Sequence, residues 1–133
     1  MQDKTVIFEA FAKKAAARLE ERKKQRTEWL KIQSIDDQIQ IRGLSDAELQ
    51  DCFDFSENAI DVDEYTIYMA SPTLQEAAKI LKAEGTIPQE YKITEMFTMS
   101  ERNYIAKRVL ALSGMDGQAN VEVIKENEEI KNS

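Results

Sequence analysis

Few side chains in this sequence could make or break a covalent bond. The chain has a single cysteine, Cys52, and no histidine, which is the commonest general base and transition-metal ligand. Cys52 falls in a helical pattern, which favours a buried structural thiol over a nucleophile. There is no glycine-rich phosphate loop, no C-x-x-C, no H-E-x-x-H and no serine elbow. We therefore expect a protein that is not an enzyme and that uses no cofactor or metal.

Carboxylates are dense between Asp51 and Glu64, in the segment DCFDFSENAIDVDE. A calcium loop spaces its oxygen ligands as D-x-[DN]-x-[DN]-G, and this segment has neither that spacing nor the turn glycine. The pattern favours a solvated acidic linker. A weak cation site and an acidic docking patch are the alternatives.

Charge is unevenly distributed along the chain. The net charge is −7, yet residues 1–31 carry nine Lys/Arg against five Asp/Glu, and the remainder carries nine against twenty. A basic arm on an acidic body suits nucleic-acid binding, self-association or solubility alone. No aromatic residues interleave with the basic run to stack on bases, so nucleic acid is the least favoured partner.

Cellular location is constrained by what the sequence lacks. No apolar run approaches the ~20 residues of a membrane-spanning helix, and the start MQDKTVIFEAF does not have the pattern of a secretory signal. A lone cysteine suits a reducing cytoplasm. We expect no membrane association.

The longest stretch with a helical apolar pattern runs from Ile93 to Gly114. A capping box is predicted from Thr98 to Glu101, and Gly114 supplies a left-handed stop. The apolar stripe is wide enough to require covering elements. It comprises Ile105, Ala106, Val109, Leu110 and Leu112.

An N-terminal helix is predicted from Thr5 to about Gln25, as a basic amphipathic segment within residues 1–26. Its apolar stripe is narrow, and its second half is almost wholly polar, so this end should be solvent-exposed. The stripe comprises Phe8, Phe11, Ala12, Ala15 and Leu19. A partly detached helix is the favoured interpretation; a partner-binding arm and a nucleic-acid arm are the alternatives.

The apolar period changes to two between Trp29 and Arg42, which predicts a β-hairpin at about residues 28–42 with a turn at Ser34–Asp37. Its apolar face comprises Leu30, Ile32, Ile39 and Ile41. A lone hairpin is marginally stable, so it must pack on helices or pair with another chain. We expect Trp29 to anchor it to the core.

Three further helices are predicted. The first opens with a capping box at Ser45–Glu48 and has Ala47, Leu49, Cys52 and Phe53 on its inner side. The next covers Asp63–Ala70, where a strand is the alternative, and the last follows Ser71-Pro72 and closes at Gly85. The fold class is thus mainly α, a small helical domain of residues 1–115 with one β-hairpin packed on or beside the helices. Residues 116–133 are predicted to be an acidic flexible tail, with a short strand around Val121–Ile124 as the alternative.

Several segments, in this order and spacing, resemble the XkdN-like tail assembly chaperones of long-tailed phages and of phage-derived elements in Gram-positive bacteria. These segments are KTVIFEAFAKK, IQIRGLSDAELQDC, the Tyr65–Tyr68 helix running into SPTLQEAAKILKAEG, ITEMF and ALSGM. The resemblance spans about residues 5–115. It implies a non-enzymatic helper of tail assembly that holds the tape-measure protein soluble while tail-tube subunits polymerise around it. It also implies action in the host cytoplasm, absence from the mature virion and, as is common in tail chaperones, a longer frameshifted form of the same protein.

A chaperone of this kind needs accessible apolar surface, and helix-in-groove packing is the expected mode. Methionines adapt to varied partners, so Met96, Met99 and Met115 are candidate partner-binding residues, with ordinary core filling as the favoured alternative. Phe8, Phe11 and Leu19 are candidates on the N-terminal helix, either as a removable cover or as a contact in a homo-oligomer. Two other functions stay open: a nucleic-acid-associated phage regulator and a structural head–tail component of the virion.

Overall fold

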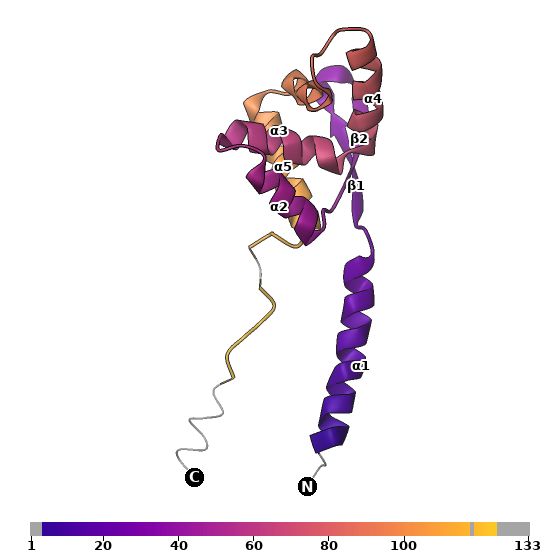
Figure 1. The fold of residues 1–133 in the computed structure, drawn as a ribbon, viewed down its shortest axis with the longest axis vertical. Helices are drawn as coiled ribbons and strands as arrows, with labels where there is room; N and C mark the ends of the chain where they lie inside the picture. The colour runs from indigo at the N-terminus through magenta and orange to yellow at the C-terminus, as the bar shows by residue number, and fades with distance from the viewer. Residues whose placement is uncertain (1–3, 118, 125–133) are drawn as a thin grey trace.

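The structure is a computed structural model that describes residues 4–117 and 119–124. It is mainly helical with a single two-stranded antiparallel hairpin, which confirms the predicted fold class. A long N-terminal helix, α1 (Lys4–Lys23), projects from a packed unit formed by the hairpin and the remaining helices (Figure 1). We call α1 the arm and residues 27–114 the body.

The hairpin pairs β1 (Thr27–Ile32) with β2 (Asp37–Arg42), and the short 3-10 helix η1 (Gln33–Ile35) connects them. Leu30 lies opposite Ile39 in the register, so the predicted apolar residues share one face. That face packs on the helices, and α4 covers the outer edge of β2, where the N–H of Gln40 donates to Thr73 Oγ1 (3.0 Å).

The predicted role of Trp29 as a core anchor is wrong. Its side chain is 57% exposed and lies on the outer face of the hairpin. The reason is the period-2 alternation of a strand: Leu30 and Ile32 point inward, so Trp29, the residue before Leu30, must point outward.

Helix α2 (Asp46–Asp54) begins with the predicted capping box, in which Ser45 and Glu48 satisfy each other's backbone N–H groups. Leu49 and Cys52 are buried as predicted. Ala47 and Phe53 are exposed, so half of the predicted inner side is wrong. A helix of this length buries only the narrow face defined by an i, i+3 pair.

Helix α3 (Ala59–Ala70) starts earlier than predicted and takes in much of the expected acidic linker. Only residues 55–58 separate α2 from α3, and Glu64 within α3 is buried. The prediction of a solvated linker over this whole segment is therefore wrong. Asn58 caps α3 by accepting a hydrogen bond from the N–H of Ile60 (2.8 Å).

Helix α4 (Pro72–Ala83) has the predicted serine cap and proline at its first turn, and Gly85 follows with a positive φ of 79°. The stretch predicted from Ile93 to Gly114 is divided into the 3-10 helix η2 (Glu90–Met96) and α5 (Met99–Leu112). The division falls at the predicted capping box, which forms between Thr98 and Glu101. The arm, with 20 residues, is longer than α5, with 14.

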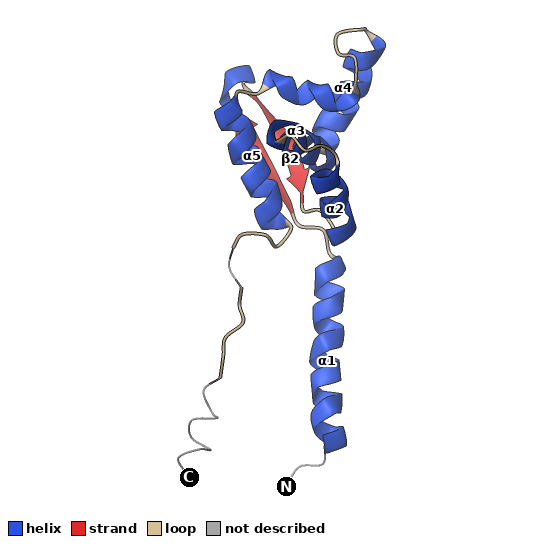
Figure 2. Ribbon diagram, turned by 60° about the vertical axis from the view of Figure 1, so that its left-hand side comes forward, coloured by secondary structure: helices blue, strands red, loops and turns tan. Residues whose placement is uncertain are grey.

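The core lies between the inner face of the hairpin and helices α2 to α5 (Figure 2). Helix α5 contributes Ile105, Ala106, Val109 and Leu112, and Leu110 is partly buried, as the stripe predicted. No residue of the arm belongs to this core. Within the predicted tail, residues 116–117 and 119–124 contain no helix or strand, and residues 118 and 125–133 lie outside the described residues.

Candidate partner-binding site

The arm presents its apolar stripe to solvent. Phe8, Phe11 and Leu19 are 66%, 71% and 63% exposed. Val6 and Ile7, which sequence reasoning did not single out, are exposed as well. Helices in proteins owe most of their stability to packing of an apolar face, and large exposed apolar side chains on one helix mark an interaction surface.

Three residues, Lys24 to Arg26, join the arm to β1. An ion pair between Arg22 and Asp46 (3.4 Å) connects the last turn of the arm to the first turn of α2. Both partners are largely exposed, and such surface pairs contribute little to stability. The position of the arm therefore rests on polar contacts at its end, and its apolar stripe remains uncovered.

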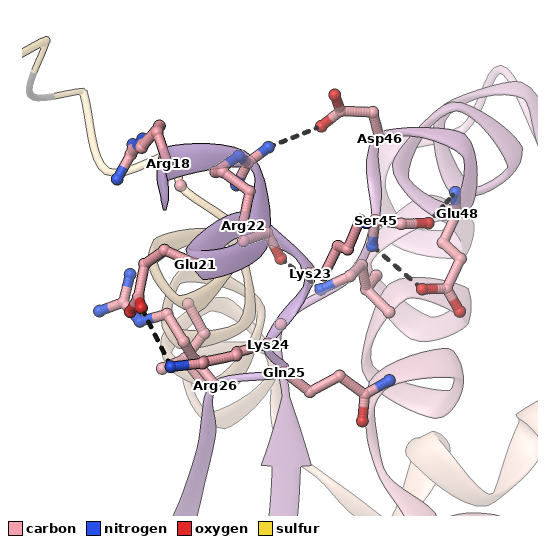
Figure 3. A pocket seen from close by; sticks show the side chains of 15 residues that line it. Arg18, Glu21, Arg22, Lys23, Lys24, Gln25, Arg26, Ser45, Asp46 and Glu48 are labelled. Atoms are coloured by element: carbon pink, nitrogen blue, oxygen red, sulfur yellow. Dashed lines mark hydrogen bonds and ion pairs between the residues drawn. The ribbon is translucent and has the colours of Figure 1, made fainter. Parts of the chain in front are cut away.

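A cleft of about 550 Å³ lies where the arm meets the body (Figure 3). The end of the arm forms one wall, and the start of α2 and the end of α5 form the other. Its charged lining comprises Arg18, Arg22, Lys23, Lys24 and Arg26 together with Glu21, Asp46 and Glu48. Figure 3 shows Arg22 reaching across to Asp46, and Lys24 pairing with Glu21 (3.3 Å). We call this the junction cleft.

Glu48 is the most strongly perturbed of these groups. The Arg42 guanidinium beside it, together with the N–H and hydroxyl of Ser45, lowers the pKa of the Glu48 carboxyl to about 2. Glu48 thus stays ionised at neutral pH, as a structural ion-pair member that joins the end of β2 to the start of α2.

A second groove, of about 410 Å³, runs between β1 and α5. Its apolar walls include Trp29, Leu30, Ile32, Tyr104 and Ile105. Trp29 and Tyr104 are more than half exposed. Sequence reasoning missed both, although strict alternation along β1 could have placed Trp29 on the outside.

The three candidate methionines are all exposed, so core filling, the favoured alternative, is wrong for them. They do not form one patch. Met96 and Met99 flank the start of α5, whereas Met115 follows its end. A 14-residue helix, about 20 Å long, separates the two places.

A corner between α2 and α3 combines apolar and acidic side chains. Phe53, Phe55 and Ile60 are exposed there, and Phe55 also stacks on Tyr65 with ring centroids 4.1 Å apart. The carboxylates of this corner are Asp51, Asp54, Glu57 and Asp61. We call residues 51–61 the acidic corner.

Among the described residues, no group of three or more His, Cys, Asp or Glu side chains could hold a metal ion. Burial raises the pKa of the Cys52 thiol, which is fully buried in α2. A thiol held in its neutral form is a poor nucleophile. In the part of the chain that the structure covers, no helix is both long and apolar enough to cross a membrane.

No protein-family model, curated protein or solved structure matches the chain. The resemblance to tail assembly chaperones, and the function that it implies, therefore stay predictions.

Proposed function

We propose that this protein is a phage tail assembly chaperone that binds the tape-measure protein during tail morphogenesis. The observation that supports the proposal is the arm, a helix whose Phe8, Phe11 and Leu19 side chains lie in solvent. A tape-measure protein is long and helical, and it exposes apolar stripes until the tail tube encloses it. Packing of its helices against the arm would cover both apolar surfaces at once.

The arrangement of the molecule suits reversible binding. The arm extends away from the body, so a partner helix can lie along it without opening the core (Figure 1). Lys13, Lys14 and Arg18 keep the uncovered arm soluble, as the net charge of −7 does for the whole chain. The protein would act in the host cytoplasm, contact tail-tube subunits and its own frameshifted longer form, and be absent from the finished particle.

Co-expression tests the proposal directly. The chain is produced with the long helical polypeptide encoded immediately downstream, and the soluble fraction of that polypeptide is measured. We expect it to be soluble with the wild-type chain and to precipitate with Phe8→Ser/Phe11→Ser. A variant with Ala10→Ser/Ala17→Ser, which lie on the opposite side of the arm from Phe8 and Phe11, is the control and should protect as the wild type does. Equal precipitation with and without the wild-type chain would refute the proposal.

Nucleic-acid binding is the second candidate, and the junction cleft is the observation that favours it. Five basic side chains gather there, but three carboxylates share the same walls and three of the basic groups are already in ion pairs. If the cleft binds phosphates, a duplex should shift on a gel and the affinity should fall steeply with salt. Replacing Arg18 and Arg26 by alanine should then flatten that dependence.

A further inference from the structure

We propose that the arm of one copy docks on the acidic corner of a second copy, in a head-to-tail contact. This contact needs no tape-measure protein and goes beyond the proposed chaperone function. Each copy has one arm and one corner, and the two surfaces differ. Contacts of this kind are heterologous, and they build rings or open chains rather than closed two-fold dimers.

The arm combines apolar and basic groups along one side. Helical spacing places Lys14 three residues after Phe11, and Arg18 three residues after Ala15, so each basic side chain borders the apolar stripe. Arg22 continues the same row toward the body. Lys13, by contrast, lies on the far side of the helix from the stripe. A partner surface for this stripe must therefore be apolar with an acidic border.

The acidic corner has this composition. Phe53, Phe55 and Ile60 supply exposed apolar area, and Asp51, Asp54 and Glu57, interleaved with them in the sequence, are exposed carboxylates. The segment from residue 43 to residue 78 contains nine Asp or Glu and no Lys or Arg. No basic residue of this segment neutralises the negative electrostatic potential of its carboxylates, so the corner would attract a basic helix.

The end of α2 gives an independent indication. Asp51 and Asp54 lie in its last turn, where the helix dipole disfavours negative charge, and no basic side chain lies in that turn. Lysine and arginine side chains from outside α2 would relieve this unfavourable arrangement. Lys14 and Arg18 of another copy are groups of that kind.

The arm does not lie on the corner of its own chain. The arm leaves the body at Lys24–Arg26 and points away from it, and both views show its far end well separated from α2 and α3 (Figures 1 and 2). The ion pair between Arg22 and Asp46 holds its near end at the start of α2. Phe8 lies about 22 Å along the helix from that end, so a second copy must supply its cover.

The mass of the full chain in solution, measured by light scattering over a range of protein concentrations, tests this contact. We expect the mass of the wild type to rise with concentration at about 0.05 M salt and to fall back toward the monomer at about 0.5 M. The arm variant Lys14→Glu/Arg18→Glu and the corner variant Asp54→Lys/Glu57→Lys should each stay monomeric, with association weakened roughly tenfold or more. The control Lys13→Glu/Lys24→Glu changes the charge by the same amount away from the stripe and should associate as the wild type does.

Mixing the two variants gives the sharpest result. The arm variant keeps a native corner and the corner variant keeps a native arm, and the reversed arm also matches the reversed corner in charge, so an equimolar mixture should associate although each variant alone stays monomeric. A chain that carries all four reversals should associate again, because the opposite charges face each other once more. Circular dichroism and thermal melts of each variant establish that it is folded.

Three outcomes would overturn the contact. The first is a wild type that stays monomeric at every protein and salt concentration. The second is a corner variant that still self-associates, which would indicate that two arms pair with each other. The third is a mixture of the two variants that remains monomeric. The assay contains no tape-measure protein, so its failure leaves the co-expression result untouched. Failure of co-expression likewise leaves this measurement valid.

Discussion

Glu48 links two structural elements through one carboxylate. Its Oε1 accepts hydrogen bonds from the Ser45 N–H (3.0 Å) and from Arg42 Nη1 (3.0 Å), and its Oε2 accepts one from Arg42 Nη2 (2.7 Å). The first contact closes the capping box of α2, and the other two hold the end of β2 against that helix. Bidentate charge-assisted bonds of this kind are among the stronger polar contacts in proteins.

Replacing Glu48 should make stability depend less on pH. Its folded pKa of about 2 is below the unfolded value, so its contribution is fully present above about pH 4.3 and is lost as the pH falls toward 2. We expect Glu48→Gln to lower the free energy of unfolding by about 1–3 kcal/mol at pH 7, and the difference from wild type to shrink below pH 4. Urea melts at pH 7 and pH 3 measure it, with the exposed Glu84→Gln at the end of α4 as control. A difference that stays constant between the two pH values would contradict this role.

Glu64 is a buried carboxylate that depends on one partner. It is 4% exposed, and Lys92 Nζ lies 3.6 Å from its Oε2, which accepts no hydrogen bond among the described residues. Lys92→Met should leave this charge unpaired and lower the free energy of unfolding by roughly 2–4 kcal/mol. Adding Glu64→Leu should recover much of the loss, because two apolar side chains of similar volume bury no charge and so carry no desolvation cost. Additive losses in the double variant would show that the two side chains act independently.

At the residue scale the sequence predicts local polar contacts better than distant ones. Both capping boxes follow from four-residue patterns, and both form. The pair of Arg108 and Glu28 joins α5 to β1 at 2.6 Å across 80 residues, and no local pattern contains it. Trp29 was predictable in principle, because strand alternation places it on the outer face. The prediction failed because it followed the general preference of tryptophan for the interior.

Gly43 fixes how closely the hairpin approaches α5. A Cβ built on it would lie 2.5 Å from the carbonyl oxygen of Leu112 and 2.9 Å from its carbon. Both are backbone atoms, so the contact can be relieved only by moving an element. The N–H of Leu44 also donates to Ser113 Oγ at this point (2.8 Å), which ties the two segments together.

Alanine at this position should therefore be costly. We expect Gly43→Ala to lower the free energy of unfolding by about 2–4 kcal/mol, since one methyl group must displace α5 from β2. Gly85→Ala is the contrasting variant, because Gly85 has open space around it and a positive φ, and should cost only about 1 kcal/mol. Thermal melts of the two variants compare them. If Gly43→Ala melts at or above the temperature of Gly85→Ala, the close approach is not what requires the glycine.

At the element scale, periodicity found the elements but not all of their boundaries. The hairpin, the capped starts of α2, α4 and α5 and the turn glycines were predictable because each has its own local chemistry. Ile93 and Met96 fit a helical stripe equally well in α and 3-10 geometry, so the division before Thr98 depends on packing of η2 against α3 and α4. The acidic segment after Asp51 was assigned to a linker from its charge, although α3 begins within it, at Ala59 after the Asn58 cap.

At the scale of the whole molecule, the body and the arm differ in what stabilises them. Buried residues from the hairpin and from α2 to α5 form one continuous core, whereas the arm depends on helix propensity and a surface ion pair. The narrow stripe and polar second half of the arm indicated its exposure from sequence alone. The acidic corner lies in a segment where the sequence offered an acidic docking patch only as an alternative; the exposure of Phe53, Phe55 and Ile60 within it depends on how α2 and α3 pack.

Removal of the arm should therefore leave the body folded. A chain that begins at Lys24 loses no core residue, and the ion pair of Arg22 with Asp46 is worth about 0–1 kcal/mol. We expect its melting temperature to lie within about 5 °C of that of the full chain at low protein concentration. A much larger fall would mean that the arm packs on the body in solution.

Amide exchange of the full chain adds the complementary measurement. Arm amides should exchange rapidly when the protein is dilute, because a lone helix opens readily, and should slow as concentration rises if a second copy covers the stripe. Slow exchange at every concentration would instead place the cover within the same chain.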